Sequence, residues 1–139
     1  MKTKRILLAV ASLGCLVGCH EDDTMEDIWP DPSDRTAVLI RGVQEAIASY
    51  WSEHQTLPLD LNRLAADRAR YLVATTDAWG TPLRYLPLER GYCIWSAGPD
   101  SQFGSSDDSG VLGDARDVAL GPLELTGPQL SSRCEVASR

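Results

Sequence analysis

Residues 77–108 read DAWGTPLRYLPLERGYCIWSAGPDSQFGSSDD, and the rest of the chain can be placed around this stretch. Apolar and polar residues alternate over 83–85 and 92–95, which is the period of strands with one buried face. From residue 97 onward the alternation stops, and residues 97–108 contain two glycines, one proline, three serines and three aspartates. A loop this polar is costly to bury unless its carboxylates are satisfied. The stretch therefore predicts a hairpin followed by a polar loop whose carboxylates need binding partners.

The aspartates of this loop are candidate ligands of a divalent cation. Calcium takes about six to eight oxygen ligands from carboxylates, backbone carbonyls and water. Asp100, Asp107 and Asp108 can converge on one ion together with carbonyls of a backbone bent by Gly98 and Gly104. Their spacing is not that of an EF-hand loop. A solvated acidic loop is the alternative interpretation.

Two motifs in this stretch resemble those of a known family, the globular domain of the major pseudopilin of type II secretion systems. They are Asp-Ala-Trp-Gly-Thr-Pro at 77–82 and Ser-Ala-Gly-Pro-Asp at 96–100, and the resemblance runs from about residue 37 to residue 108. Thr81 stands where the family usually has asparagine. The resemblance implies an α+β fold in which one long N-terminal amphipathic helix packs on a small antiparallel sheet of about three strands with a long calcium-binding loop.

The same resemblance implies a set of ligands for a structural calcium ion. It gives the side chains of Asp100 and Asp107 and the backbone carbonyl of Ala97. The family's further acidic ligand falls nearer Ser109 than Asp108, so Asp108 would serve after a shift of one residue.

The beginning of the chain does not resemble that family. Three basic residues lie within the first five, an apolar run covers 6–17, and Leu-Val-Gly-Cys at 16–19 resembles the lipobox of bacterial lipoproteins. This implies that 1–18 is a signal peptide and that Cys19 becomes the first mature residue, carrying diacylglycerol and an amide-linked acyl chain such as palmitate. Several acyl chains give lasting anchorage, since each buried methylene contributes about 0.8 kcal/mol. An ordinary secretory signal with an incidental cysteine is the alternative.

This start also separates the chain from a true pseudopilin, which enters its filament through a long apolar N-terminal helix. No such helix is expected here, so the family's mechanical role is not carried over with its globular domain. The residue after Cys19 is His20 and not aspartate. By resemblance to enterobacterial lipoproteins, this favours the outer membrane over the inner one, in a periplasm-facing or surface position.

The charge of the chain disfavours some partners. Its formal charge is −7, and removal of residues 1–18 takes away three of the 13 basic residues and none of the 20 acidic ones, which leaves −10. Nucleic acids and anionic lipid surfaces repel such a chain. The expected membrane contact is therefore the lipid on Cys19.

The cysteines indicate an oxidising compartment. The chain has four, of which Cys15 lies in the signal and Cys19 is the lipid site. Cys93 and Cys134 remain, and an even pair in an exported domain suggests a disulfide, which would contribute about 3–4 kcal/mol. Two separate thiols are the alternative.

Hydrophobic periodicity and the positions of proline and glycine predict the structure of the remaining segments. Residues 19–33 are acidic and carry two prolines, which is typical of a linker. The domain is expected over 34–120, with an amphipathic helix at 34–54, a shorter helix at 60–70 and a last strand at 116–120. Residues 121–139 read as a proline- and glycine-marked tail, tied back by Cys134 if the disulfide forms.

No catalytic pattern stands out. His20 and His54 are the two histidines, and no nucleophile elbow, paired-histidine motif or glycine-rich phosphate loop occurs. We therefore expect a non-catalytic, lipid-anchored envelope protein that is accessory to protein secretion, with pseudopilins, the secretin or secreted proteins as partners. The alternative is a free-standing envelope lipoprotein that binds or supports something unrelated to secretion. A glycan-degrading enzyme using Asp100 and Asp107 as its carboxylate pair is a third hypothesis.

Overall fold

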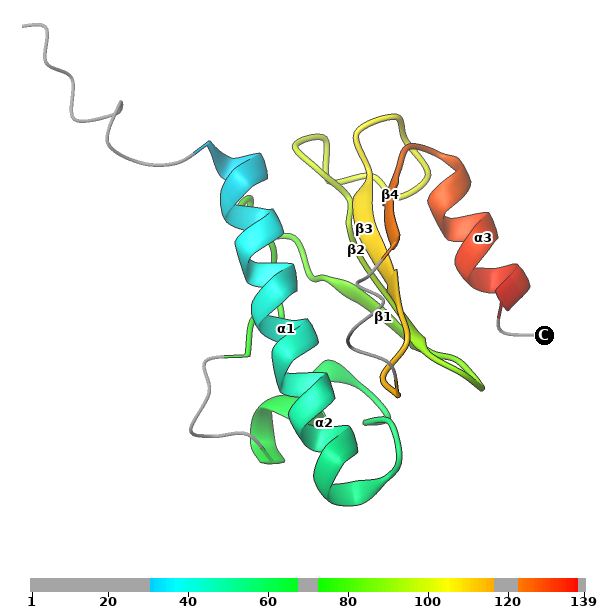
Figure 1. The fold of residues 1–139 in the computed structure, drawn as a ribbon. Coiled ribbons are helices and arrows are strands. Elements are labelled where there is room, and N and C mark those ends of the chain that lie inside the picture. The colour runs from blue at the N-terminus through cyan, green and yellow to red at the C-terminus, as the bar shows by residue number, and fades with distance from the viewer. Residues whose placement is uncertain (1–30, 68–72, 117–122, 138–139) are drawn as a thin grey trace, which may run out of the picture.

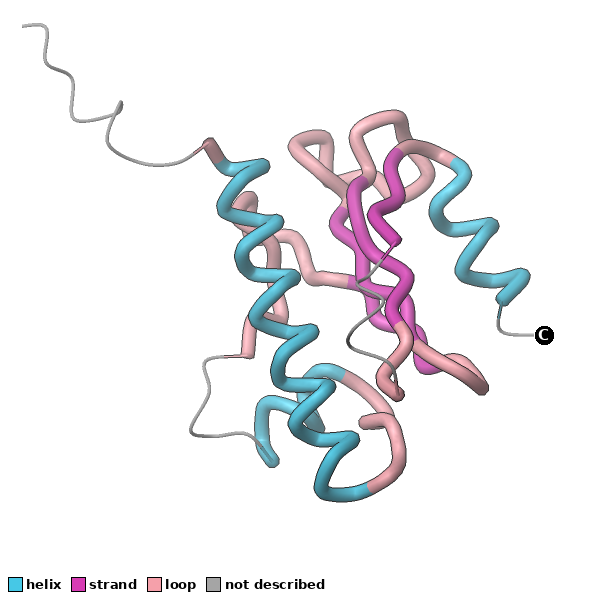
Figure 2. The backbone as a smooth tube through the Cα atoms, in the orientation of Figure 1, coloured by secondary structure: helices cyan, strands magenta, loops and turns pink. Residues whose placement is uncertain are grey.

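The computed structural model describes residues 31–67, 73–116 and 123–137. Its elements in chain order are α1 (Pro32–His54), α2 (Leu61–Asp67), β1 (Arg84–Pro87), β2 (Tyr92–Ser96), β3 (Ser109–Gly113), β4 (Leu123–Thr126) and α3 (Gln129–Ala137). The strands form one antiparallel sheet in the order β1-β2-β3-β4, and Figures 1 and 2 show this sheet between α1 and α3. The predicted α+β class is confirmed, but the sheet has four strands and not about three.

Helix α1 is the predicted long helix, and it starts two residues before the predicted position 34. The carboxylate of Asp31 accepts a hydrogen bond of 2.8 Å from the backbone N–H of Ser33, and Pro32 occupies the first helical turn. Both features favour a helix start. The bonds from Ser33 also lower the pKa of the Asp31 carboxyl. The helix ends at His54, and the cap residue Gln55 has a left-handed backbone (φ 55°) whose N–H donates to the carbonyl of Trp51.

Strand β3 lies at 109–113, within the glycine-marked sequence after the acidic loop, where no strand was predicted. The last strand was predicted at 116–120, and residues 117–120 lie outside the described part. Glycines disfavour strands in general, which is why sequence patterning passes over this segment. Here they are needed for space. A Cβ on Gly110 would overlap the Ile94 carbonyl and the Trp95 side chain, and a Cβ on Gly113 would overlap the ring of Tyr92. Small residues in β3 thus allow large ones in β2.

The sheet has a buried core on each face, which explains why all five residues of β2 are buried. Residues facing α1 form the larger core with α1 and α2, and its members include Ile40, Val43, Ile47, Leu64, Ile94 and Val111. Residues facing α3 form the smaller core, whose buried members are Cys93, Trp95, Leu125, Leu130 and Cys134. Helices α1 and α3 therefore cover the two faces of the sheet, so the domain has three layers and β2 lies in its interior.

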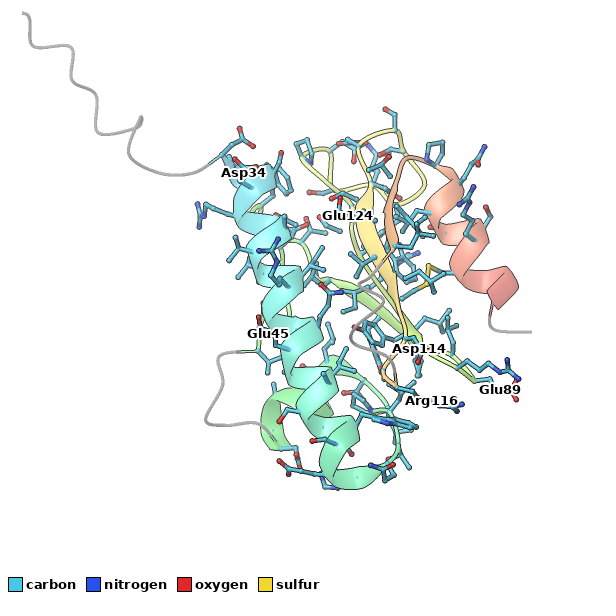
Figure 3. The ribbon with its side chains drawn as sticks, viewed as in Figure 1. Asp34, Glu45, Glu89, Asp114, Arg116 and Glu124 are labelled. Carbon is cyan, nitrogen blue, oxygen red and sulfur yellow. A yellow bond between two sulfur atoms is a disulfide. The ribbon has the colours of Figure 1, made fainter. Side chains whose placement is uncertain are left out.

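The expected C-terminal tail is instead part of this structure. It contributes β4, which pairs with β3, and α3, which places Leu130 and Cys134 against the far face of the sheet. Cys134 forms the predicted disulfide with Cys93, with 5.9 Å between their Cα atoms (Figure 3). Proline and glycine in this segment mark the junction between two short elements, since Gly127 (φ 81°) turns the chain from β4 into α3.

Several expectations concern residues outside the described ranges. The signal peptide at 1–18, the lipid site Cys19 and most of the linker at 19–33 all lie there. The second helix, predicted at 60–70, is described over 61–67. Within the described ranges no helix combines the length and apolarity required to cross a bilayer.

Candidate functional site

The turn before β1 is built on the buried carboxylate of Asp77, which is 4% exposed. One of its oxygens accepts hydrogen bonds from the backbone N–H groups of Trp79 (3.0 Å) and Thr81 (2.8 Å). The other accepts a 2.6 Å hydrogen bond from the hydroxyl of Ser96 at the end of β2. Asp77 therefore joins the turn to the start of the candidate loop.

The same turn is attached to α1. The backbone N–H of Ala78 donates to the hydroxyl of Thr36, which is buried in the first half of that helix. Trp79, the large side chain of this turn, is only half-buried. The hydrogen bonds of Asp77 and Thr36 carry the attachment instead. In turns, an aspartate side chain often accepts a hydrogen bond from the backbone N–H two residues further on. The position of Asp77 two residues before Trp79 was therefore the available sequence signal.

The loop between β2 and β3 begins with a bend that only glycine accommodates well. The hydroxyl of Ser96 accepts a hydrogen bond of 3.0 Å from the N–H of Gly98, whose backbone is left-handed (φ 68°). A Cβ on Gly98 would come within 2.6 Å of the carbonyl oxygen and 2.9 Å of the Oδ2 atom of Asp107. The start and the end of the loop are therefore in direct contact.

Two of the three loop carboxylates gather at one hydroxyl. The Ser105 hydroxyl donates to Asp107 Oδ1 and lies 3.4 Å from Asp108 Oδ1. The bond from Ser105, together with the N–H of Asp100 at 3.2 Å, lowers the pKa of Asp107. Asp108 is only 1% exposed, and its other oxygen accepts from the N–H of Gly104 at 2.8 Å. The loop thus concentrates negative charge at its base.

The third carboxylate belongs to Asp100 and accepts a hydrogen bond of 2.7 Å from the N–H of Gln102, and the Asp100 side chain also interacts with that of Asp107. Over the described residues, no three histidine, cysteine, aspartate or glutamate side chains gather closely enough to hold a metal ion. Ala97 is fully buried beside the loop. Ser109 is the first residue of β3, where it pairs with Thr126 and lines a cavity beside α1.

Phe103 anchors the tip of the loop to the sheet. Its ring lies edge-on to Trp95, with centroids 6.4 Å apart, and the guanidinium carbon of Arg84 lies 3.8 Å from its centroid. Arg84 and Trp95 are cross-strand partners in β1 and β2. The charge of Arg84 thus lies over an aromatic ring, which is a favourable contact. Phe103 is the one phenylalanine of the chain, and its place in a polar loop was the signal.

A hydroxyl pair joins the loop to the turn before β1. The Thr81 hydroxyl donates a hydrogen bond of 2.8 Å to the hydroxyl of Ser101, whose backbone is left-handed (φ 57°). The loop is thereby attached to the rest of the domain at its start, its tip and its middle.

Comparison with protein-family models, with curated proteins and with solved structures gives no match to this chain.

Proposed function

We propose that this chain is a non-catalytic, lipid-anchored protein of the bacterial cell envelope, accessory to protein secretion, whose domain resembles the type II secretion pseudopilin and binds calcium as a structural ion. The lipid on Cys19 is its membrane contact, with the outer membrane favoured. Its proposed partners are pseudopilins, the secretin or secreted proteins.

The loop between β2 and β3 carries this proposal. Asp107 and Asp108 direct carboxylate oxygens at the same Ser105 hydroxyl, and the missing Cβ of Gly98 lets Asp107 approach the start of the loop closely. Hard cations such as calcium prefer carboxylate and carbonyl oxygens. In this proposal Asp107 and Asp108 are the first calcium ligands, with the carbonyl of Ala97 and the side chain of Asp100 as further ligands. Calcium would neutralise adjacent carboxylates and stabilise the folded form.

The disulfide supports export to an oxidising compartment. Cys93 and Cys134 are both buried, and their bond fixes α3 to the centre of the sheet. Disulfides of this structural kind persist outside the cytosol. An exported domain is what a lipoprotein signal at 1–18 would deliver.

Thermal unfolding of the purified full chain tests the calcium site. We expect a higher melting temperature in calcium than in chelator, with the difference largely lost in Asp107→Asn and Asp108→Asn. Asp114→Asn is the matched control, because Asp114 is exposed beyond β3 and caps the N–H of Arg116. Equal melting temperatures of the unmodified chain in calcium and chelator would contradict the site.

The anchor and the secretion role need separate measurements. Mass spectrometry of the mature N-terminus should find acyl chains on Cys19, and Cys19→Ser should release the protein from the membrane fraction. Affinity purification from the producing bacterium should recover pseudopilins or the secretin, and deletion should impair secretion. If secretion is intact and neither partner is recovered, the free-standing lipoprotein is the better interpretation.

A further inference from the structure

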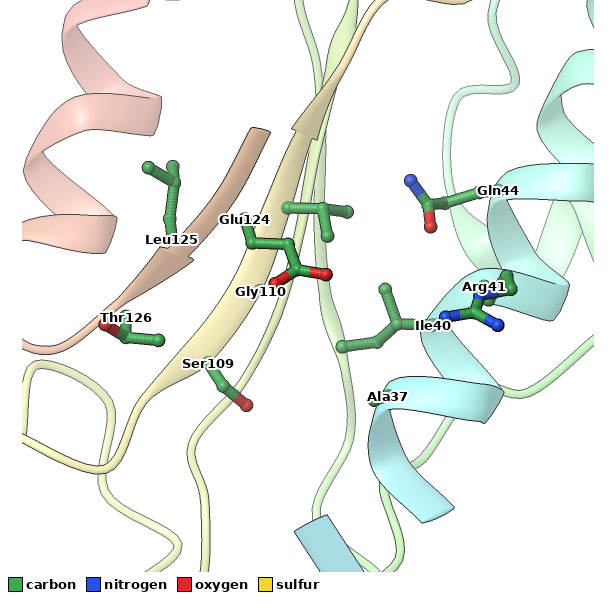
Figure 4. A pocket seen from close by; sticks show the side chains of 10 residues that line it. Ala37, Ile40, Arg41, Gln44, Ser109, Gly110, Glu124, Leu125 and Thr126 are labelled. Carbon is green, nitrogen blue, oxygen red and sulfur yellow. The ribbon is translucent and has the colours of Figure 1, made fainter. Parts of the chain in front are cut away.

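The α1-facing side of the sheet is only partly covered. A helix with its side chains is about 10 Å wide and strands are spaced about 4.8 Å apart, so one helix covers about two strands. Helix α1 packs on β2 and β3. This leaves a cavity of about 370 Å³ between α1 and the β3–β4 end of the sheet (Figure 4).

The walls of this cavity combine an apolar floor with charged rims. Ile40 and Val111 form the floor, while Arg41 comes from α1 and Glu124 from β4. Figure 4 shows the Glu124 carboxylate directed toward α1, and Leu125 directed the other way. Arg41 and Glu124 form no ion pair with each other in the described part of the chain. Their charges are therefore available to something that enters the cavity.

A second cavity lies on the opposite side of the same strand. It measures about 220 Å³ and is lined by Glu124, Leu125 and Thr126 of β4 together with Gln129, Leu130 and Arg133 of α3. The carboxylate of Glu124 is directed away from this cavity, toward α1 (Figure 4). Its charged contribution from α3 is the guanidinium of Arg133. Strand β4 thus has an apolar-floored cavity on one face and a basic side chain on the other.

Strand β4 is also an edge strand. It pairs with β3 on one side, and within the described residues no strand pairs with its other side. An edge strand presents unpaired N–H and C=O groups that can accept another strand. Leu123 and Glu124 are exposed along it, and neither proline nor lysine interrupts it.

From these features we propose that β4 binds an extended peptide segment of a partner protein by strand addition. Successive residues of an added strand point to opposite faces, so alternate side chains would enter the two cavities. The α1 side accepts an apolar side chain over Ile40 and Val111. The α3 side accepts an acidic side chain facing Arg133. The recognised segment therefore alternates apolar and acidic residues. This inference does not depend on calcium, on the lipid or on secretion.

The test uses the purified full chain and a capped heptapeptide of alternating valine and aspartate, with binding followed by fluorescence anisotropy of a labelled copy. We expect saturable binding with a Kd below about 1 mM and protection of β4 amides from hydrogen exchange. Two further peptides carry N-methyl groups on every second nitrogen, one at the odd positions and one at the even positions. One of the two should not bind, because its methyl groups remove the N–H groups that bond to β4. Absence of saturable binding, or equal binding of both methylated peptides, overturns the proposal.

Substitutions at exposed positions locate the site. Ala37→Trp fills the α1-side cavity and should weaken binding about tenfold or more, whereas Ala66→Trp on exposed α2 should not. Arg133→Glu should also weaken binding, with Arg63→Glu as its control. Equal affinity of Ala37→Trp and Ala66→Trp would place the peptide elsewhere and overturn the proposal. A chain dimer that the peptide dissociates would identify a second copy as the occupant, and would overturn it too.

Discussion

The hydroxyl of Ser96 donates a 2.6 Å hydrogen bond to the buried carboxylate of Asp77, across 19 residues of sequence. Asp77 begins the turn before β1, and Ser96 ends β2 at the start of the candidate loop. The same Ser96 oxygen accepts the N–H of Gly98. The geometry of the loop is therefore set by a carboxylate outside it.

Removal of the Asp77 carboxylate should be the most destabilising single change in this region. Asp77→Ala leaves the N–H groups of Trp79 and Thr81 and the Ser96 hydroxyl without their acceptor, and each unsatisfied buried group costs about 1–3 kcal/mol. We expect a loss of about 3 kcal/mol or more in urea unfolding. Asp34→Ala, an exposed change in the first turn of α1, should cost no more than about 1 kcal/mol. Similar losses for the two would show that Asp77 does not organise the turn.

Reduction of the Cys93–Cys134 bond should weaken the fold substantially. The bond spans 41 positions of sequence, and the chain-entropy relation for a loop of this size gives about 4 kcal/mol. Urea unfolding with and without reductant measures the effect. The double variant Cys93→Ala, Cys134→Ala is the control, because reductant should leave it unchanged. A reductant effect of the same size in the double variant would refute the assignment.

Two glycines should respond in opposite directions to alanine. Gly42 is exposed within α1 with nothing within 4 Å of an added Cβ, so Gly42→Ala should stabilise the chain by about 1 kcal/mol through helix propensity. Gly110→Ala should destabilise it by at least about 1 kcal/mol, because the added Cβ overlaps Ile94 and Trp95. Thermal unfolding of both variants measures the two effects. An unchanged stability of Gly110→Ala would contradict the close packing of β2 on β3.

Acid should weaken the loop through Asp107. The pKa of this carboxyl is lowered in the folded chain, first by the Ser105 hydroxyl. A lowered folded pKa contributes stability above the unfolded-state value of about 3.9, and that stability is lost as the pH falls through the folded pKa.

Unfolding in chelator at neutral pH and at pH values below about 3.9 measures this loss. Ser105→Ala should make the stability difference between the two conditions smaller, because it removes the main cause of the shift. Ser106→Ala, an exposed change one residue further on, should leave the difference as it is. If both serine variants behave alike, Ser105 does not stabilise the charged carboxylate.

Local patterns in the sequence predicted much of the fold. The periodicity of Ile40, Val43 and Ile47 predicted α1 and its buried face, and the alternation around Tyr85 and Ile94 predicted the hairpin of β1 and β2. These signals are local, since each residue reports its own environment along one element. The cysteine count likewise favoured the disulfide between β2 and α3.

The missed elements depend on contacts distant in sequence. Strand β3 carries Gly110 and Gly113 because Trp95 and Tyr92 occupy the space beside them. Helix α3 is short and is held by Cys134 and Leu130 against the far face of the sheet. Because glycine and proline disfavour regular structure, secondary-structure propensities predict a loop or a tail in both segments.

For the candidate site, the sequence by itself determined the chemistry: three aspartates, three serines and two glycines in residues 97–108. Only the tertiary structure decided which of them meet. It places Asp107 and Asp108 at Ser105 and brings Asp100 to Asp107, because Asp77, Phe103 and Gly98 fix the path of the loop. Side-chain type follows from the sequence, but the direction of a side chain follows from the backbone, and distant contacts fix that backbone.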